Sequence, residues 1–333
     1  MKYLLYISFL VLSLVTNAQK PIVVDINGKG DFTSIQAAIN SLNDSSEKER
    51  IIQIKNGVYN EKLLIEKNNI VFEGESRDKV IITQSIARDE FRCSHKDDWG
   101  VATVNINGND ITLINLTIKN SFGFEFKEEF TIPCESDSSH VKTIRKSGHQ
   151  MALRSIKASR LKAINCYFSS YGGDTVSPWN VENGFFYFKD CKMEGGVDFY
   201  CPRGWAWAEN CDFYSYGGTA SVWHDGSKNP DSKSVLMNCR FSGIKNFYLG
   251  RYHRDAQMYL VNCSFDENLR DSALYHVPKS SETSWGHRIY YYNCHRKGGD
   301  YNWFKNNLPE SVKENQITLD WLFNAKWNPE KNK

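Results

Sequence analysis

The chain has 333 residues and a formal net charge of +2, with acidic and basic residues interspersed along it. This balance argues against nucleic acid or an anionic membrane surface as a partner, because either would need a basic patch. Aromatic residues make up 14% of the chain and many stand beside Gly, Asp or His. This pattern suits a surface that stacks on sugars, and it suits equally well the aromatic residues at the solvent edge of a large β fold.

The first 18 residues predict a secretory signal peptide. Lys2 precedes an apolar run over residues 3–15, and small residues up to Ala18 form a cleavage site. No later run is long and apolar enough to cross a bilayer. We therefore expect a secreted or periplasmic monomer with no membrane contact, in which residues 19–333 form a single domain.

The first half of this domain predicts one short helix followed by strands. Residues 31–42 carry a capping box at Thr33 and Gln36, and apolar residues then follow at helical spacing. Such a helix would cover an open strand edge. Short strand-like runs bounded by Gly, Asn or Asp come next, up to residue 119. Residues 121–147, with charges, a proline and a serine cluster, read as a long surface loop.

A repeat runs through the second half. Strand-like segments in which Asn or Asp precedes a cysteine recur at intervals of 25, 20, 28, 24 and 31 residues, at Cys166, Cys191, Cys211, Cys239, Cys263 and Cys294. Strand-rich units at this period predict a parallel β-helix, in which equivalent positions of successive coils stack about 4.8 Å apart. The repeated cysteines are therefore expected to be stacked thiols inside the coil.

Two cysteines and the C-terminal tail lie outside this repeat. Cys93 and Cys134 stand in loop-like segments and are the best candidates for a disulfide. Residues after Trp303 read as an irregular tail, with a short helix near residues 319–323 that folds back along the coil.

The same period brings a set of polar residues together. Asp198 lies 24 residues after Asp174, which lies 24 residues after Gln150, and Arg251 follows 53 residues later, about two coils on. We expect all four side chains on one face of adjacent coils. An arginine keeps a nearby carboxylate ionised and able to act as a nucleophile, and a second carboxylate can hold a proton for a leaving group. An amide can stabilise an oxyanion. The set predicts acyl transfer through Asp198, although Asp–Arg pairs across coils are also common structural features.

These segments resemble the pectin methylesterases, a family of carbohydrate esterases. The opening, DINGKGDFTSIQAAINSL, is similar to the start of that family, and Gly57, Tyr59 and Glu61 match its G-x-Y-x-E region. GHQMALRS, YGGDTV, EGGVDFYCPRGWAWAENC and YLGRYH resemble its Q-A-V-A-L, Q-D-T, V-D-F-I-F-G and L-G-R-P-W segments, in the same order.

The resemblance implies an all-β fold, a right-handed single-stranded parallel β-helix. It also implies hydrolysis of the methyl esters of galacturonic acid in pectin, with no metal and no cofactor. In these terms Asp198 is the nucleophile, Asp174 the acid and then base, Gln150 the oxyanion stabiliser and Arg251 the residue that orients Asp198. Tyr200, Trp205, Trp223, Tyr252 and His253 are candidates for lining a sugar groove.

Three departures from the family pattern bear on the substrate. Gly173 stands where the family has a second glutamine, Tyr252 and His253 replace its Pro-Trp pair, and residues 201–204 replace a tight glycine turn. These changes favour a methyl ester within a branched pectin. The alternatives are a β-helix that binds pectic polysaccharide after its catalysis has decayed, or an esterase for another ester on pectin. A calcium-dependent lyase fits poorly because the acids are spread one per coil, and a polygalacturonase-like hydrolase fits poorly with this residue order.

Overall fold

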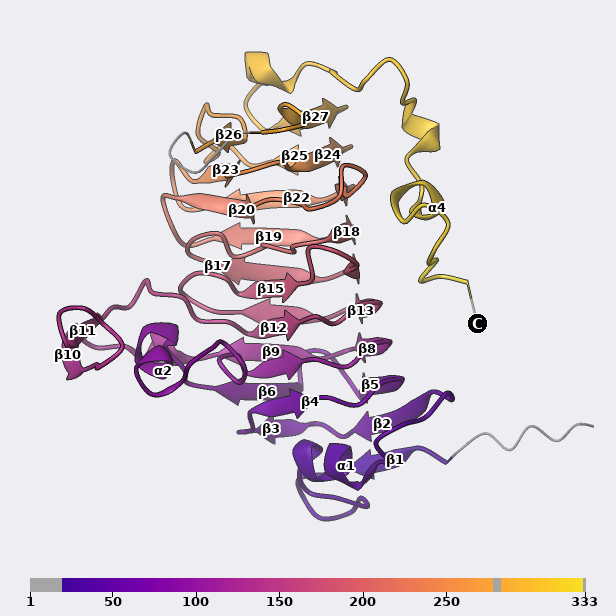
Figure 1. Cartoon of the computed structure of the whole chain (residues 1–333). Helices are drawn as coiled ribbons and strands as arrows, with labels where there is room; N and C mark the ends of the chain where they lie inside the picture. Colours follow the sequence, from indigo (N-terminus) through magenta and orange to yellow (C-terminus); the bar gives the residue numbers. More distant parts are fainter. Residues whose placement is uncertain (1–19, 278–282, 332–333) are drawn as a thin grey trace, which may run out of the picture.

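The computed structural model describes residues 20–277 and 283–331, and the expected signal peptide lies outside them. Parallel sheets line three sides of an elongated stack of coils, and successive strands of the chain fall in one sheet after another (Figure 1). Residues one coil apart pair in parallel, for example Leu161 with Phe186. This is the parallel β-helix that the period of the sequence predicts.

Two of the sheets extend nearly from end to end. Sheet A contains β1 (Ile22–Val24), β2 (Arg50–Ile54), β5 (Ile70–Gly74), β8 (Ile111–Ile114), β13 (Leu161–Ile164), β16 (Phe185–Lys189), β18 (Trp205–Glu209), β21 (Ser234–Met237), β24 (Gln257–Val261) and β27 (Arg288–Tyr292). Sheet B contains β3 (Gly57–Tyr59), β6 (Val80–Gln84), β9 (Thr117–Asn120), β14 (Tyr167–Ser169), β17 (Lys192–Gly195), β19 (Asp212–Ser215), β22 (Arg240–Gly243), β25 (Ser264–Phe265) and β28 (His295–Arg296).

The Asn-Cys repeat forms the corner between sheets A and B. At each corner the residue before the cysteine has a φ of 49–55°, a left-handed conformation that Asn and Asp tolerate better than other residues with a side chain. The six repeat cysteines are buried free thiols in the interior of the coil. The expectation of stacked thiols is thereby confirmed.

The third sheet is interrupted, and the interruption matters for function. One part contains β4 (Leu63–Ile65), β7 (Val104–Ile106), β12 (Leu153–Ile156) and β15 (Val176–Trp179), and the other contains β20 (Ala220–His224), β23 (Tyr248–Tyr252) and β26 (Tyr275–His276). Between them the coil of residues 196–204 makes only isolated bridges, such as Val176 to Tyr200 and Tyr200 to Val222. The segment around Asp198 is therefore a break in a sheet.

A short helix lies at the N-terminal end of the stack. In α1 (Ile35–Ser41), Ile35, Ala38 and Ile39 are buried in the core. The expected capping box is displaced by one residue, because the N-cap is Ser34, whose hydroxyl accepts from the amide of Ala37. Glu61 completes the cap, since its carboxylate accepts from the amides of Ile35 and Gln36, each at 2.9 Å.

Residues 121–147 are more ordered than a surface loop. They include α3 (Phe122–Glu125) and an antiparallel hairpin of β10 (Phe130–Pro133) and β11 (Val141–Ile144). A disulfide joins Cys134 to Cys93 in α2 (Arg88–Ser94), which confirms the expected pair. Helix α2 and the hairpin thus project together from one side of the coil (Figure 1).

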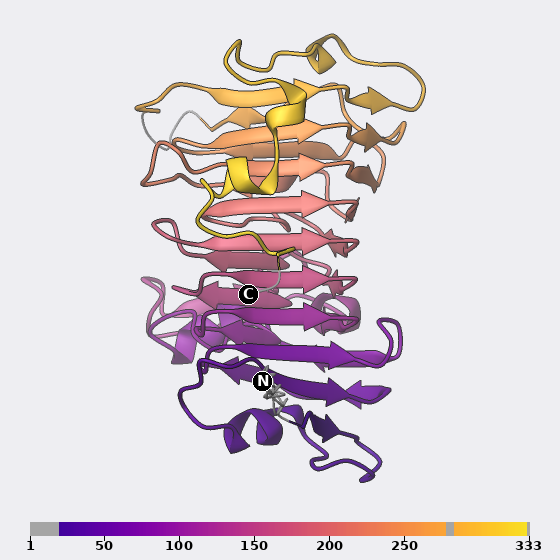
Figure 2. The ribbon, with the colours of Figure 1, turned by 90° about the vertical axis from the view of Figure 1, so that its right-hand side faces the viewer.

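The C-terminal tail folds back over the outer face of sheet A, as expected (Figure 2). It contains two 3-10 turns, Asn302–Phe304 and Glu314–Gln316, and α4 (Leu319–Leu322). Leu322 and Phe323 pack in a cluster with Trp205 and Trp207 of β18. The tail therefore covers aromatic side chains that would otherwise face water.

Candidate active site

The break in the third sheet brings the expected residues into line. Isolated parallel bridges pair His149 with Gly173 and Gly173 with Val197, so the next residues, Gln150, Asp174 and Asp198, occupy equivalent positions of three successive coils. Two backbone hydrogen bonds fit the same register: the N–H of Gln150 donates to the carbonyl of Gly173, and the N–H of Asp174 donates to the carbonyl of Val197. The 24-residue period therefore predicts the alignment correctly.

Arg251 reaches this row from two coils further on. Arg251 pairs with Trp223 in the ladder of β20 and β23. The backbone N–H of Asp198 donates a hydrogen bond to the carbonyl of Ala220, which lies three residues before Trp223 in β20. The long side chain spans this offset. Arg251 Nη2 lies 2.7 Å from Asp198 Oδ2, and Arg251 Nε lies 3.2 Å from Asp198 Oδ1. The guanidinium therefore forms a bidentate ion pair with the carboxylate.

The electrostatic setting of Asp198 differs from the simplest expectation. Burial raises the pKa of the Asp198 carboxyl above its usual range, and the hydrogen bond and charge of Arg251 lower it without fully offsetting burial. Asp174 raises this pKa further and His149 lowers it. Only 7% of the Asp198 side chain is exposed, so the cost of desolvation exceeds the gain from the ion pair. When ionised, this carboxylate has few waters to shed before it attacks a carbonyl carbon.

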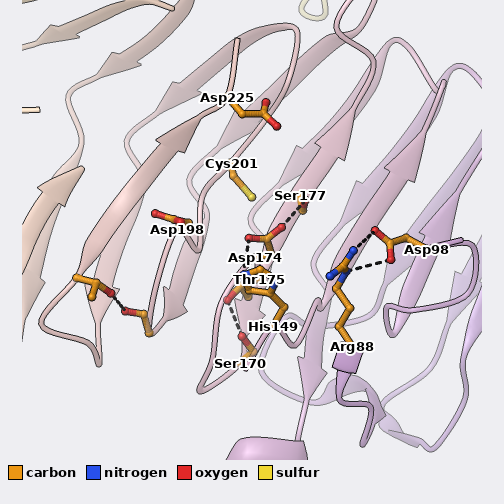
Figure 3. Close-up of polar contacts among 12 residues, drawn as sticks. Arg88, Asp98, His149, Ser170, Asp174, Thr175, Ser177, Asp198, Cys201 and Asp225 are labelled. Carbon is orange, nitrogen blue, oxygen red and sulfur yellow. Dashed lines mark hydrogen bonds and ion pairs between the residues drawn. The ribbon is translucent and has the colours of Figure 1, made fainter. Parts of the chain in front are cut away.

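Asp174 lies one coil below Asp198 and has a different set of neighbours (Figure 3). The hydroxyl of Ser177 donates to its Oδ2 at 3.4 Å, and His149 Nε2 lies 3.8 Å from its Oδ1. The guanidinium of Arg203 lies 3.9 Å from Oδ2. Asp174 and Asp198 both have a left-handed backbone, with φ of 58° and 48°. Two carboxylates thus meet at one break in the sheet, one held by an arginine and the other beside an imidazole.

A buried arginine pair supports Asp174, and the sequence reasoning did not include it. Arg203 donates to Asp225 at 3.1 Å and to Ser177 Oγ at 2.9 Å, and Arg154 donates to the same hydroxyl at 2.7 Å. Both guanidiniums lie against the ring of Trp179, at 4.5 and 4.7 Å from its centroid. The signal was an arginine in the Cys-Pro-Arg-Gly segment, which departs from the family pattern. The network fixes Ser177 and, through it, the Asp174 carboxylate.

The structure gives Gln150 a different task from the one expected. Its side chain is buried, with a relative exposure of 1%. Its Oε1 accepts from the amides of Gly123 and Gly172 at 3.0 and 3.3 Å, and its Nε2 donates to the carbonyl of Lys146 at 2.5 Å. An amide held in this way braces the backbone beside the site. It does not project toward a reacting carbonyl, so we do not retain it as the oxyanion stabiliser.

His149, the residue before Gln150, is the polar side chain that does face the site. It is 43% exposed, and Figure 3 shows its ring beside Asp174. The sequence reasoning missed it. The period places His149 at the coil position equivalent to Gly173, but it does not say whether His149 or Gln150 faces outward.

Two of the five aromatic candidates prove to be wrong. Tyr200 is 1% exposed and packs inside the coil between Phe188 and Phe213. Trp205 lies in sheet A beneath the tail, where it meets Phe185. Neither can contact a substrate at Asp198, because one side chain points into the core and the other lies on a different face.

The other three candidates lie next to Arg251. The guanidinium carbon of Arg251 lies over the ring of Trp223, 4.9 Å from the ring centroid. The Trp223 ring packs edge-on against the ring of His253, with 4.1 Å between the two centroids. Tyr252 is 4% exposed and its hydroxyl meets His287 Nδ1 at 2.7 Å. His253 is half-buried and is therefore the candidate of the three best able to meet a ligand.

Two hollows in the surface of the protein lie away from the two aspartates. Hollows of about 490 and 470 Å³ lie over other faces of the coil, and neither is lined by Asp174 or Asp198.

Among the described residues no cluster of three His, Cys, Asp or Glu side chains is arranged to hold a metal ion. No helix in the described ranges is long and apolar enough to span a membrane.

Known proteins that are similar to this chain include pectinesterases. The family model described as Pectinesterase matches residues 21–168. Similar curated proteins of Arabidopsis thaliana include the putative pectinesterase 11, 27% identical over 83% of this chain and 71% of its own length. The probable pectinesterase 67 of the same plant is 23% identical over 93% of this chain and 86% of its own length.

Solved structures share the fold over almost the whole chain. A pectin methylesterase in complex with a hexasaccharide superposes with a TM-score of 0.73 at 23% identity, covering 95% of this chain and all of that one. Pectin methylesterase PemA of Erwinia chrysanthemi gives 0.72 at 23% identity, over 94% and 99%. The carrot enzyme gives 0.67 at 20%, over 86% of each chain.

Proposed function

We propose, from the premise that this chain belongs to the pectinesterase family, that it hydrolyses methyl esters of galacturonic acid in pectin and releases methanol. The observation that carries the proposal is the bidentate ion pair of Arg251 with the buried Asp198 carboxylate, at a break in the sheet beside Asp174. The sequence resemblance assigns the same residues to this reaction.

In the proposed reaction Asp198 attacks the ester carbonyl carbon and forms a tetrahedral oxyanion. The intermediate collapses, the methoxy group takes a proton from Asp174 and methanol leaves, so that an acyl anhydride remains on Asp198. A water molecule then gives a proton to the Asp174 carboxylate and attacks the acyl carbon. This step releases the galacturonic acid carboxyl group and restores both aspartates. Arg251 orients Asp198 and stabilises its ionised form.

We further propose a branched region of pectin as the preferred substrate, with the protein acting outside the cytoplasm as a monomer. The proposal is supported by the surroundings of Arg251, where Tyr252 is buried and His253 packs edge-on against Trp223. A half-buried histidine therefore stands at position 253, where the family has an open tryptophan. A pectin-binding protein without activity is the second candidate, favoured by the fact that Gln150 is bound to backbone and Gly173 has no side chain.

The test is methanol release by the mature chain, with Asp198→Asn and the control Asp190→Asn, from linear methylated homogalacturonan and from a branched pectin fraction. Asp190 is a suitable control because it has the same left-handed backbone, with a φ of 55°, at an exposed corner. We expect release by the parent and the control, at a higher kcat/KM on the branched fraction, and none above background by Asp198→Asn. Binding without release by a folded parent would favour the second candidate.

A further inference from the structure

The proposed reaction needs a hydrogen-bond donor for the oxyanion, and most nearby donors are already occupied. The amides of Gly173, Asp174 and Asp198 donate to Gly148, Val197 and Ala220 within the stack. Gln150 is bound to backbone. Arg251 holds both oxygens of Asp198, and Arg203 is buried with bonds to Asp225, Ser177 and the carbonyl of Cys201.

His149 differs from these groups in both exposure and position. Its side chain is 43% open to solvent, and its Nε2 lies 3.8 Å from Asp174 Oδ1. It occupies the coil position equivalent to Gly173 and Val197, directly beside the row that carries the two aspartates. At 3.8 Å this contact is longer than a hydrogen bond, so Nε2 is free to donate to a ligand that binds beside Asp174.

Gly173 makes room for this ring. A Cβ on residue 173 would lie 2.6 Å from His149 Cδ2 and 2.8 Å from Val197 Cγ1, closer than side-chain atoms approach one another. A glycine at this position therefore does more than remove a side chain, because it lets the imidazole lie over the backbone next to Asp174.

We propose that His149 is a catalytic residue of this site, whose imidazole N–H donates a hydrogen bond to the oxyanion formed when Asp198 attacks the ester. The inference rests on the proposed function and adds a residue to it. His149 forms no covalent bond and transfers no proton in this role. Removing one such donor typically lowers kcat by about 100- to 1,000-fold.

Two variants of similar size separate a donor from a proton carrier. His149→Gln keeps an N–H donor near the position of Nε2 but cannot carry a proton, and His149→Leu has no donor. His295→Gln, at an exposed position of β28, is the matched control. Methanol release is measured from the preferred pectin fraction, with the thermal midpoint of each variant as the test of folding. His149→Ala replaces the leucine variant if that one does not fold.

We expect His149→Leu to lower kcat by about 100- to 1,000-fold with KM within about threefold, and His149→Gln to retain kcat within about tenfold of the parent. The inference is overturned if His149→Leu stays within threefold of the parent. It is also overturned if His149→Gln is as slow as His149→Leu, which would assign proton transfer to the imidazole. If the parent and His295→Gln release no methanol, the proposed function fails, and this inference with it.

Discussion

Replacement of Arg251 by glutamine tests whether the ion pair sets the ionisation of Asp198. Opposite charges about 4 Å apart are worth about 4 kcal/mol at an effective dielectric constant of about 20. The Arg251 side chain is 30% exposed, so water weakens the attraction, and we take about 1.4 to 2.7 kcal/mol as the effect. At about 1.4 kcal/mol for each pH unit, this corresponds to about 1 to 2 pH units.

The sign follows from what remains after the substitution. Burial already raises the pKa of Asp198, and Arg251 is the largest influence that lowers it. Without the guanidinium the ionised nucleophile is less stable, so the acidic limb of the kcat/KM profile moves to higher pH. The measurement is methanol release as a function of pH for the parent, Arg251→Gln and the surface control Arg240→Gln, whose partner is the exposed Asp212.

An acidic limb that stays in place in Arg251→Gln, while kcat falls at every pH, would refute this reasoning. It would mean that Arg251 serves the reaction by binding substrate, and that another group sets the limb. A shift of equal size in Arg240→Gln would also refute it, because a distant surface charge should act only weakly through water.

Three variants, one of them a double substitution, test the fold and the ionisation of the site. Burial raises the folded-state pKa of Asp198, so ionisation of this carboxyl group opposes folding. The stability that the group contributes is present below about pH 4 and is lost as the pH rises through the folded-state pKa. The thermal midpoint of Asp198→Asn should therefore exceed that of the parent by an amount that increases with pH across this window. Cys93→Ser with Cys134→Ser should lower the free energy of unfolding by about 3 to 4 kcal/mol in urea titrations, since the bridge closes a separation of 41 residues, and dithiothreitol should no longer affect that variant. Trp205→Ala removes a side chain that is buried beneath the tail, so it should lower the free energy of unfolding by about 3 to 5 kcal/mol and leave KM for pectin unchanged. A raised KM would instead indicate that Trp205 contacts the substrate.

The sequence predicts the alignment of the site better than the direction of its side chains. A repeat of fixed length determines which residues share a position on successive coils, and Gln150, Asp174 and Asp198 do so. It does not determine which of two neighbours faces outward. Where the backbone is left-handed, as at both aspartates, the simple alternation of a strand no longer applies. The choice of Gln150 over His149 therefore could not be made from the period.

The aromatic residues show the same limit for a different reason. Tyr200 and Trp205 lie close to Asp198 in the sequence, but each coil turns corners within a few residues, so close positions face different sides. Which side is covered depends on the tail, whose cluster of Leu322 and Phe323 buries Trp205. A contact between residues more than one hundred positions apart is not visible in local pattern. The thiol positions were predictable because they recur on every coil.

The left-handed backbone at Asp198 also decides which variant reports on its charge. Asparagine tolerates a φ near 48°, whereas alanine in this region costs about 1 to 2 kcal/mol because its Cβ crowds the following carbonyl oxygen. Asp198→Ala would therefore remove the nucleophile and strain a coil that is held only by isolated bridges. Asp198→Asn removes the charge and keeps both the shape and the conformational preference. If Asp198→Asn is inactive with an unchanged unfolding transition near pH 4, the lost activity belongs to the carboxylate and not to the coil that carries it.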